Sequence, residues 1–496
     1  MSDLEFGAHL ADLGLTALGG REVLITGLSV DSRDVKEGHL FFALPGTNMH
    51  GAEFIEFALR MGAAAVLTDR EGAEIAREAL ERAGRPLVIA EDPRQTLAFA
   101  AALWFETQPE CVVAVTGTNG KTSIATFLRQ IWTLLGQRAA NIGTTGVEGA
   151  VEMPSRHTTP EPIALHRMLA ELAAAGVTHV AMEASSHGLA QKRLDGVQLS
   201  AAGFTNITQD HLDYHADFED YFLTKAGLFQ RVLSEDGAAV VNDGDPRSGD
   251  IRKIVDARGI DLLSVGRREG SDLRIRGQRF DATGQDLRFD WHGQAVQMRL
   301  ALIGGFQAEN VLMAAGLAIA SGSDPQRVFD ILPQLQTVRG RMQLAATRTF
   351  GATVFVDYAH TPDALATALK ALRPHVLGRL VLVFGAGGDR DRSKRVLMGR
   401  AAATHADTVF VTDDNPRGED PEVIRRMIMG GCPEAVEVGD RAEAILRGVD
   451  ALGPGDALLI AGKGHETGQI VGDDVYPFDD AEQASVAVAA LDGQLT

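Results

Sequence analysis

The sequence predicts an α/β protein of three domains. These are a small N-terminal α/β domain over 1–94, a central doubly wound parallel-sheet domain over 95–337, and a C-terminal Rossmann-like α/β domain over 338–496. Short apolar, β-branched segments alternate with helical segments along most of the chain, which is the pattern of parallel strands joined by crossover helices. The 496 residues also exceed what a single hydrophobic core usually serves.

Composition limits the partners and the compartment. The chain has 47 Lys and Arg against 67 Asp and Glu, a formal net charge of −20, which disfavours non-specific binding to nucleic acid or to an anionic membrane. Cys111 and Cys432 are too few for a disulfide framework. No segment has the pattern of a secretory signal or of a membrane span of about 18 apolar residues. We expect a soluble, cytoplasmic monomer that binds small molecules.

The N-terminal region has the pattern of a small α/β unit without a phosphate-binding loop. Two polar segments in it, 29–33 and 45–51, could bind a ligand, although such residues taken alone more often cap helices and form turns. Apolar periodicity predicts strands at 22–25, 40–44, 64–67 and 87–89 and helices at 52–61 and 74–83.

A phosphate-binding loop stands near the start of the central region. The apolar run 112–115 indicates a buried strand, and an apolar-periodic helix begins at Ser123. Between them, glycine N–H groups, the helix N-terminus and Lys121 suit a phosphate, while the Thr122 hydroxyl can reach Mg²⁺. Val115 replaces the first glycine of the usual G-x-x-x-x-G-K-[ST] pattern, so this is the tighter variant G-T-N-G-K-T. The expected ligand of this P-loop ATPase-like domain is ATP, bound by Gly117, Thr118, Asn119, Gly120, Lys121, Thr122 and Ser123.

Polar clusters follow two further strands of the central region. Because the carboxyl ends of parallel strands meet at one edge of a sheet, Glu183 and His211 are candidate metal ligands beside the phosphate loop. Solvated loops or helix caps remain the alternative. Lys225 lies on a helix with one apolar face, and sequence alone favours a surface lysine there. The pattern predicts strands at 177–182, 201–205 and 238–241, helices at 162–175, 218–234 and 308–321, and an antiparallel insert or edge between 262 and 302.

In the C-terminal region three strands end in polar, glycine-containing turns, at 385–395, 412–417 and 461–466. Acidic, basic and backbone N–H groups therefore converge on one rim. This mixture suits a zwitterion such as an amino acid better than a phosphate alone. The predicted strands are 354–356, 380–384, 408–411 and 457–460, and the predicted helices are 362–372, 395–405, 421–429 and 441–449.

Seven motifs together resemble those of the Mur ligases. Within that family they are similar to the ligases that add the third residue of the peptidoglycan stem peptide. The motifs are T-G-T-N-G-K-T-S at 116–123, E-A-S-S-H-G at 183–188, T-N-I-T-Q-D-H-L-D-Y-H at 205–215, D-Y-A-H-T-P-D at 357–363, G-G-D-R-D at 387–391, D-N-P-R at 414–417 and G-K-G-H-E at 462–466.

The resemblance implies an ATP-dependent ligase that adds meso-2,6-diaminopimelate to UDP-N-acetylmuramoyl-L-alanyl-D-glutamate in peptidoglycan precursor synthesis. A carboxylate is not an electrophile at neutral pH, so ATP must first convert the D-glutamyl γ-carboxylate into an acyl phosphate. The incoming amine then expels phosphate. Positioning and charge neutralisation dominate such phosphoryl transfer, and closure between domains would exclude water.

The resemblance also implies catalytic and metal-binding roles. Lys121, Lys225 and His211 would be catalytic. Lys225 matches the lysine that the family carbamylates, and a carbamate would turn this cation into a carboxylate able to position a second Mg²⁺. The implied metal ligands are Thr122, Glu183, His211 and carbamylated Lys225.

Substrate contacts are implied in the same way. Gln307 departs from the family, since many relatives have asparagine there, and this puts only the detailed nucleotide contact in question. Nucleotide contacts would come from Asn310, Arg341, Asp357 and His360. The UDP end would lie near Ser29, Asp31, Ser32, Arg33 and His50. The muramoyl-dipeptide part would lie near Thr158, Thr159, Ser185, Gln191 and Arg193.

The acceptor is a question of charge. Diaminopimelate carries a second amino-acid head with a carboxylate, whereas lysine ends in an ammonium. Arg417 and Arg390 would bind that carboxylate and repel a lysine side chain. Glu466 would pair with the distal ammonium. The implied pocket consists of Arg390, Asp414, Asn415, Pro416, Arg417, Gly462 and Glu466.

Three alternatives remain at this stage. The nearest is the same ligase acting on L-lysine. A folylpolyglutamate-synthase-like ligase is disfavoured by the N-terminal domain and by the D-N-P-R motif. A non-catalytic ATP-binding partner is disfavoured by the intact Lys121, Glu183, Lys225 and His211.

Overall fold

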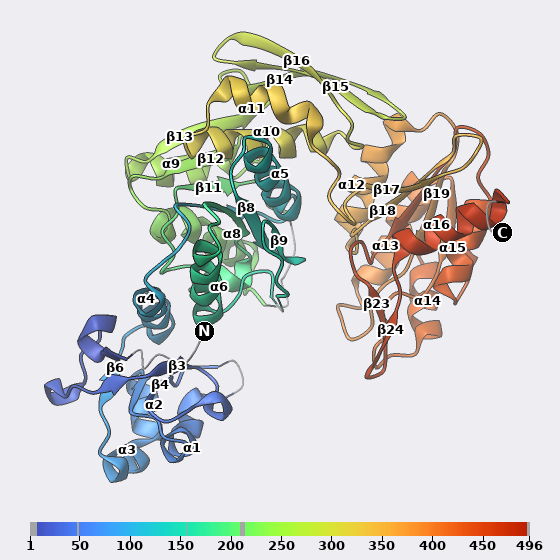
Figure 1. Cartoon of the computed structure of the whole chain (residues 1–496). Helices are drawn as coiled ribbons and strands as arrows, with labels where there is room; N and C mark the ends of the chain where they lie inside the picture. Colours follow the sequence, from blue (N-terminus) through green and yellow to red (C-terminus); the bar gives the residue numbers. More distant parts are fainter. Residues whose placement is uncertain (1–6, 47–48, 156, 209–213, 494–496) are drawn as a thin grey trace.

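The computed structural model describes residues 7–46, 49–155, 157–208 and 214–493. Figure 1 shows three successive parts of the chain, with the central part lying between the N-terminal part at lower left and the C-terminal part at right. Each part has its own β-sheet with helices packed on it. The predicted three-part α/β architecture is therefore confirmed, while the predicted boundaries between the parts stay a prediction.

The N-terminal part is built on a four-stranded parallel sheet in the order β3-β4-β5-β6. Of the strand predicted at 22–25, only the last two residues form a strand, β2, which pairs with β1 in a separate two-stranded sheet. The sequence analysis predicted neither β1 nor β3, which ends at Ser29. The strands are β1 (Ala8–His9), β2 (Leu24–Ile25), β3 (Gly27–Ser29), β4 (His39–Phe42), β5 (Ala65–Thr68) and β6 (Leu87–Ile89); the α-helices are α1 (Ile55–Arg60), α2 (Arg70–Ile75) and α3 (Arg77–Ala83).

Helix α4 (Pro93–Phe105) leads from the N-terminal part to the central one. Asp92 caps it by accepting a hydrogen bond from the N–H of Gln95, and Pro93 fits the first turn because that turn needs no N–H from it. The helix packs against α6 (Pro162–Ala174) of the central part. The predicted boundary after residue 94 thus falls in the first turn of a helix that is shared by both parts.

The central part is a ten-stranded sheet in the order β16-β15-β14-β13-β12-β11-β7-β10-β8-β9. The strands from β14 to β8 in this order are parallel, and β14, β15 and β16 are antiparallel to one another. The antiparallel segment predicted between 262 and 302 therefore begins only at β14, because β13 within that range is a parallel strand. The hairpin of β8 and β9 was not predicted. The strands are β7 (Cys111–Thr116), β8 (Ala139–Gly143), β9 (Gly146–Gly149), β10 (His179–Glu183), β11 (Ala201–Phe204), β12 (Ala238–Asn242), β13 (Asp261–Gly266), β14 (Leu273–Asp281), β15 (Gly284–Trp291) and β16 (Gln294–Leu300).

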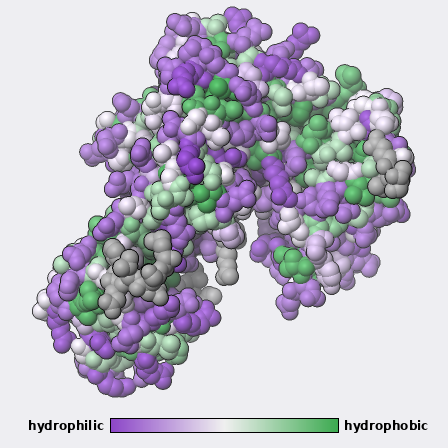
Figure 2. All heavy atoms as spheres, in the orientation of Figure 1, coloured by the Kyte–Doolittle hydropathy of each residue, from purple (hydrophilic) through white to green (hydrophobic). Residues whose placement is uncertain are grey.

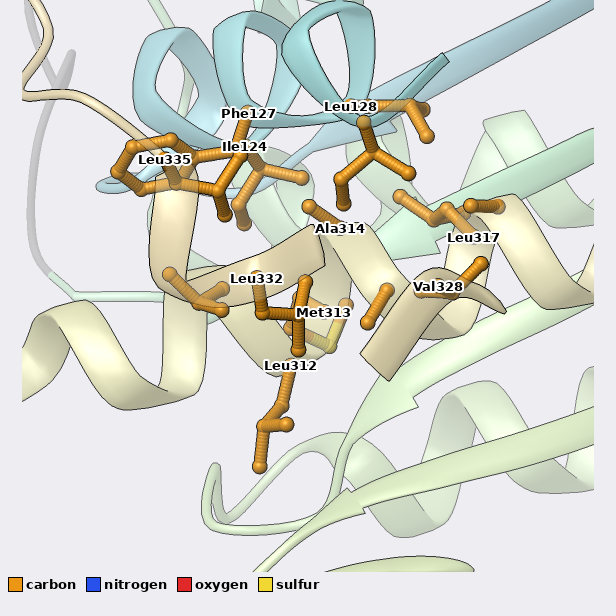
Figure 3. Close-up of a cluster of buried hydrophobic side chains, with 14 of the residues drawn as sticks. Ile124, Phe127, Leu128, Leu312, Met313, Ala314, Leu317, Val328, Leu332 and Leu335 are labelled. Atoms are coloured by element: carbon orange, nitrogen blue, oxygen red, sulfur yellow. The ribbon is translucent and has the colours of Figure 1, made fainter. Parts of the chain in front are cut away.

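Helices cover both faces of this sheet because its central strand is apolar on both sides. Val113 and Val115 of β7 pack into one core, whereas Val112 and Ala114 pack into the other. The first core lies under α5 (Lys121–Leu134), α10 (Phe306–Ala320) and α11 (Pro325–Ile331), whose side chains interdigitate in Figure 3. Each large apolar side chain buried there contributes about 1.5–3 kcal/mol. Helix α5, which follows the phosphate loop, is held firmly as a result.

The remaining helices of the central part are α6, α7 (Ser186–Ala190), α8 (Phe218–Gly227) and α9 (Ser248–Ala257). The predicted single helix over 218–234 is interrupted, because α8 ends at Gly227 and a π-helical turn, Leu228–Val232, follows. Such turns often lie beside functional residues. This one begins three residues after Lys225.

The C-terminal part is a six-stranded sheet in the order β17-β18-β22-β19-β20-β21, parallel except for the edge strand β17. The four predicted strands and four predicted helices are confirmed within one residue at most ends. The strands are β17 (Gln343–Thr347), β18 (Thr353–Asp357), β19 (Leu380–Phe384), β20 (Thr408–Val411), β21 (Val436–Glu437) and β22 (Ala457–Ala461), and the α-helices are α12 (Pro362–Leu372), α13 (Lys394–His405), α14 (Pro421–Met429), α15 (Arg441–Asp450) and α16 (Asp480–Leu491).

A separate hairpin, β23 (Gly468–Val471) and β24 (Asp474–Pro477), follows β22. It was not predicted. Its strands are largely exposed, and a glycine turn joins them. The hairpin matters for function because its first strand holds the backbone of one of the polar turns.

The central and C-terminal parts are joined by a buried histidine. His375 donates a hydrogen bond from Nδ1 to the carbonyl of Asp281 (2.7 Å) and accepts one at Nε2 from the N–H of Gly304 (3.0 Å). Its ring also lies edge-on to Phe280, with centroids 5.0 Å apart. This arrangement requires the neutral imidazole, and burial accordingly lowers the pKa of His375.

The face of the molecule in Figure 2 is mostly hydrophilic, with apolar residues scattered over it. Exposed large apolar side chains, such as Leu377 and Val475, are spread over all three parts. Within the described ranges, no helix is both long and apolar enough to cross a membrane.

Candidate active site

The phosphate loop connects β7 to α5, and its glycines are required by its shape. Gly117 has φ +144° and Gly120 has φ +88°, conformations that other residues rarely adopt. A Cβ on Gly117 would collide with Oγ1 of Thr205, and one on Gly120 would lie 2.8 Å from Oδ1 of Asn310. The loop is therefore wrapped closely by β11 and α10, and Asn310 lies beside it as predicted for a nucleotide-binding residue.

Two lysines converge on one carbonyl of this loop. Lys121 donates from Nζ to the carbonyls of Gly117 and Thr118, each at 2.8 Å, and Lys225 donates to the carbonyl of Gly117 at 2.9 Å. Lys225 is 1 % exposed, and its Nζ lies 4.6 Å from the centroid of the Tyr221 ring. The sequence-based interpretation of Lys225 as a surface lysine is therefore wrong, because the helix turns this side chain into the site.

Buried oxygen atoms meet beside the loop. Glu183, at the end of β10, is 2 % exposed, and its Oε1 accepts hydrogen bonds from Oγ1 of Thr122 (3.0 Å) and from the N–H of Thr144 (3.0 Å). Carboxylate and hydroxyl oxygens are the ligands that Mg²⁺ prefers, so the predicted pair fits this ion. His211 lies outside the described residues. Among the described residues, no group of three or more His, Cys, Asp or Glu side chains could hold a metal.

Arg341, from the C-terminal part, reaches the phosphate loop. Its Nη2 donates to Oγ1 of Thr122 at 3.3 Å, while its guanidinium lies over the Tyr358 ring at 4.7 Å. Its Nε has no hydrogen-bond partner among the described residues, although it is buried. One side chain thus links the C-terminal sheet to the residue that also contacts Glu183.

The other predicted nucleotide residues, Asp357 and His360, differ in burial. Asp357 accepts hydrogen bonds from the N–H groups of Met342 (2.7 Å) and Ala359 (2.9 Å), and burial raises the pKa of its carboxyl. It fixes the backbone around Arg341. His360 is exposed, with Nδ1 2.8 Å from the carbonyl of Tyr358.

Gln307, the departure from the family pattern, is fully buried. Its Oε1 accepts a hydrogen bond from Nδ2 of Asn310 at 3.3 Å. Its own Nε2 has no partner among the described residues. Gln307 therefore orients Asn310, which in turn borders Gly120.

The five residues predicted for the muramoyl-dipeptide are brought together beside Glu183. Oγ1 of Thr159 donates to the carbonyl of Glu183 (2.8 Å) and lies 3.0 Å from Oγ of Ser185. Arg193 donates to the carbonyl of Thr159 (2.6 Å) and to Oε1 of Gln191 (2.8 Å). Thr158 completes the cluster through a 3.2 Å contact with Thr144.

The residues predicted for the UDP end lie in the N-terminal part, where several have local partners. Asp31 caps a 3₁₀ turn and pairs with Arg33, whose hydrogen bonds lower the pKa of this carboxyl. His50 accepts from the N–H of Ala52 and contacts Asp69 at 3.1 Å. The capping interpretation of these polar segments is confirmed for Asp31 and His50. Ser29 contacts Nδ1 of His39 at 2.8 Å, Ser32 is buried, and the Arg33 side chain is 82 % exposed.

Two turns of the C-terminal part, 412–417 and 461–466, lie against each other at the predicted acceptor pocket. Asn415 donates from Nδ2 to Oε2 of Glu466 at 2.8 Å. A Cβ on Gly462 would lie 2.5 Å from Oδ2 of Asp414, so these turns meet in van der Waals contact. Arg417 has φ +50°, and strand β23 holds its backbone through its N–H (3.1 Å to Ile470) and its carbonyl.

The third predicted turn lies beside this pocket. Arg417 donates from Nη1 to the carbonyl of Gly388 at 3.0 Å, which ties the D-N-P-R motif to the turn after β19. Pro416 lies against the same turn, because a Cβ on Gly388 would collide with its carbonyl oxygen. Arg390 is exposed at the rim. The structure therefore brings together all seven residues that were predicted for the acceptor pocket.

Sequence reasoning missed three buried, positively charged residues next to the turns of this pocket. Lys463 has a fully buried side chain whose Nζ lies 2.9 Å from Oδ1 of Asn415. Arg395 is buried against Glu419, and Arg441 against Asp480. Lys463 stands inside the G-K-G-H-E motif, but nothing in its spacing indicates burial. The two arginines lie on helices whose other charged residues are exposed or partly exposed.

Burial also perturbs two titratable groups next to the pocket. His465 has its pKa lowered to about 4 by burial, with the charges of Arg341 and Arg339 acting in the same direction. Its ring lies 5.1 Å from that of Tyr358, the pKa of which burial raises. At neutral pH both side chains are uncharged, so the wall between Arg341 and the acceptor pocket is neutral.

Comparison with known proteins places each part of the chain in one family. Residues 24–104 match the model described as "Mur ligase family, catalytic domain". Residues 115–318 match "Mur ligase middle domain", and residues 340–464 match "Mur ligase, glutamate ligase domain".

Similar proteins extend over nearly the whole chain. A relative from Bradyrhizobium diazoefficiens is 48% identical and covers 94% of this chain and 95% of its own; one from Caulobacter vibrioides is 48% identical and covers 95% and 96%. Both are named UDP-N-acetylmuramoyl-L-alanyl-D-glutamate--2,6-diaminopimelate ligase. A solved structure of a ligase of that name has a TM-score of 0.72 at 33% identity and covers 98% of this chain and 99% of its own. A folylpolyglutamate synthase of Mycobacterium tuberculosis shares only the fold, with a TM-score of 0.62 at 20% identity over 75% of this chain and 92% of its own. With relatives this similar over its full length and all three parts matched, the chain belongs to the Mur ligase family.

Proposed function

We propose that this protein is the ATP-dependent ligase that joins meso-2,6-diaminopimelate to UDP-N-acetylmuramoyl-L-alanyl-D-glutamate in peptidoglycan precursor synthesis. The curated relatives that are 48% identical carry the name of this reaction. The observation that carries the proposal is the bridge made by Arg341. It connects the phosphate loop of the central part to Tyr358 of the C-terminal part, and the Tyr358 ring lies 5.1 Å from that of His465 in the 461–466 turn.

The reaction has two steps. An oxygen of the D-glutamyl γ-carboxylate attacks the γ-phosphorus of ATP, and the bond to the β-phosphate oxygen breaks, giving an acyl phosphate and ADP. The acceptor amine then attacks the acyl carbon, a proton leaves the nitrogen, and the carbon–oxygen bond to phosphate breaks. The product is an amide, with ADP and inorganic phosphate released.

This chain's residues supply position and charge for both steps. In the proposal, Lys121 leaves its present carbonyl partners for the ATP phosphates, and the N–H groups of the loop bind the same phosphates. Asn310, Arg341, Asp357 and His360 border the nucleotide, with Asp357 acting through the backbone. The cluster of Thr158, Thr159, Ser185, Gln191 and Arg193 holds the muramoyl-dipeptide next to Glu183.

Magnesium would be held by oxygen ligands beside the loop. Thr122 and Glu183 fit one ion, and His211 and Lys225, as a carbamate, would complete the metal-binding set. Mg²⁺ would neutralise charge on the phosphoryl oxygens. Lys225 is 1 % exposed and its Nζ lies 2.9 Å from the carbonyl of Gly117, so a carbamate on this nitrogen would lie beside the phosphate loop, where it could bind a cation.

The acceptor pocket suits a zwitterionic head. Arg417 and Arg390 offer guanidinium groups to the distal carboxylate, and Glu466 offers a carboxylate oxygen to the distal ammonium. Asp414, Asn415, Pro416 and Gly462 shape the pocket between them. A lysine acceptor would place its lone ammonium among these arginines. We therefore propose diaminopimelate as the acceptor and L-lysine as the alternative.

The remaining features of the proposal concern the rest of the protein. The N-terminal part would hold the UDP end at Ser29, Asp31, Ser32, Arg33 and His50. A cytoplasmic location is proposed, since both cysteines are free and buried as in a reducing compartment. We also propose a monomer. The domain limits 1–94, 95–337 and 338–496 are also proposals.

The test is phosphate release from ATP and Mg²⁺ with UDP-N-acetylmuramoyl-L-alanyl-D-glutamate. The assay compares meso-diaminopimelate with L-lysine and determines the product mass. Turnover with diaminopimelate alone is the expected result. Turnover with lysine alone would keep the reaction and overturn the proposed acceptor. Turnover with neither would favour the non-catalytic ATP-binding partner.

A further inference from the structure

Beneath the acceptor pocket lies a lysine without any exposed atom. Lys463 has a side-chain exposure of 0%, and its Nζ donates to Oδ1 of Asn415 at 2.9 Å. It also lies 3.4 Å from Oε2 of Glu466. A buried ammonium is costly unless it is paired and hydrogen-bonded, so this placement must be compensated by these two partners.

Lys463 determines which way the Asn415 amide faces. Oδ1 accepts two hydrogen bonds, from Lys463 and from the N–H of Ile470 at 2.9 Å. Because both of these groups can only donate, the oxygen must face Lys463 and Ile470, and Nδ2 must face Glu466. One N–H of Nδ2 donates to Glu466 at 2.8 Å; the second makes no hydrogen bond with a described residue, and Asn415 is only 3 % exposed. Asn415 is therefore presented as a donor, suited to a carboxylate.

Lys463 also contacts only one of the two carboxylate oxygens of Glu466, so the two have different surroundings. Oε2 contacts both Asn415 and Lys463, whereas Oε1 makes no hydrogen bond with any described residue. The Glu466 side chain is 33% exposed. One oxygen is thus occupied in the interior and the other faces open space, where it suits a single ammonium group.

We infer that Lys463 is a positioning residue for the acceptor: it orients Asn415 toward the distal carboxylate and leaves one oxygen of Glu466 for the distal ammonium. The inference rests on the proposed function and deepens it. Lys463 does not touch the acceptor. By partly neutralising Glu466, it also lowers the attraction of the pocket for a ligand that ends in an ammonium alone, such as L-lysine.

The experiment measures steady-state kinetics of Lys463→Met with both acceptors. We expect the KM for diaminopimelate to rise about 10- to 100-fold, as for loss of a hydrogen bond to a charged group, with kcat changed less than about 5-fold. The ratio of kcat/KM for diaminopimelate over lysine should fall. Lys253→Met is the matched control, because the Lys253 side chain is 80% exposed on α9 and should leave both constants unchanged.

Asn415→Ala and the double variant separate positioning from loss of folding. If Lys463 acts through Asn415, the double variant should bind diaminopimelate about as weakly as Asn415→Ala alone. Additive effects on KM, or an unchanged KM in Lys463→Met, would overturn the inference. A thermal unfolding curve shows whether each variant is folded, and Asn415→Asp, which keeps an acceptor for Lys463 but removes the N–H groups, should raise KM without unfolding. Failure of the unaltered enzyme to use diaminopimelate would instead refute the proposed function.

Discussion

Arg441→Met removes a buried guanidinium that contacts two of the turns of the acceptor pocket. Arg441, at the start of α15, donates from Nε and Nη2 to the two carboxylate oxygens of Asp480, both at 2.7 Å. It also donates to the carbonyls of Ala461 (3.1 Å) and Asp413 (3.3 Å), which immediately precede Gly462 and Asp414. The side chains of Arg441 and Asp480 are both 0% exposed.

The magnitude follows from this burial. Removing one partner of a buried ion pair leaves the other charge without compensation, which costs about 3–5 kcal/mol. At about 2–4 °C per kcal/mol for a domain of this size, Tm should fall by about 6–20 °C. The double variant Arg441→Met, Asp480→Leu removes both charges of this buried pair, so it should recover much of the lost stability.

The assay is thermal unfolding of the two single variants and the double variant. Arg447→Met, on the same helix, is the control: its pair with Glu443 is exposed (54%/44%) and is worth about 0–1 kcal/mol. Losses below about 1 kcal/mol in Arg441→Met, or a double variant less stable than either single one, would refute the reasoning.

Three further predictions concern chemistry and pH. Lys225→Arg should fold normally but lose most of its activity, because arginine cannot form the carbamate; near-normal phosphate release would exclude that role. Arg417→Ala should raise the KM for diaminopimelate about 10- to 100-fold through loss of a charged hydrogen bond, and an unchanged KM would show that the carboxylate binds elsewhere. Burial lowers the pKa of His166 to about 4, below its unfolded value of about 6.5. The folded state therefore loses up to about 3 kcal/mol as the pH falls from about 6.5 to about 4. In urea unfolding at pH 7.5 and 5, His166→Phe should lose less stability than the unaltered protein, and an equal loss in both proteins would contradict this assignment.

Local signals predicted the elements that carry both pockets. The apolar run before Thr116 and the glycines after it predicted β7, the phosphate loop and α5. A continuous β-branched segment followed by G-T-N-G-K-T is typical of a strand, a loop and a helix in this order. Four of the six C-terminal strands were equally clear, since β18, β19, β20 and β22 are apolar runs bounded by polar or glycine residues, whereas the edge strands β17 and β21 were missed. By contrast, β3 was missed although it is no shorter than β6, because its residues Gly27–Ser29 include a glycine and a serine and so lack the apolar run that indicates β6.

The features that the sequence could not give depend on tertiary contacts. Lys225 was interpreted as a surface residue because a lysine on an amphipathic helix is usually exposed, and only the packing of α8 against the loop places its Nζ next to Gly117. The β23–β24 hairpin consists of exposed, weakly apolar residues, so it has no hydrophobic pattern. Its role, which is to hold the backbone of Arg417, arises from a pairing between segments over 50 residues apart in the sequence.

Two polar links between described residues of the central and C-terminal parts restrict how these parts can move. One is the hydrogen bond from Arg341 to Thr122, and the other is the pair of hydrogen bonds made by His375. The link at His375 lies within an apolar contact, because Ile303 and Phe306 of the central part pack into the C-terminal core. Breaking the single bond between Arg341 and Thr122 would leave this packed joint intact, so the acceptor pocket would then reorient about it as about a hinge.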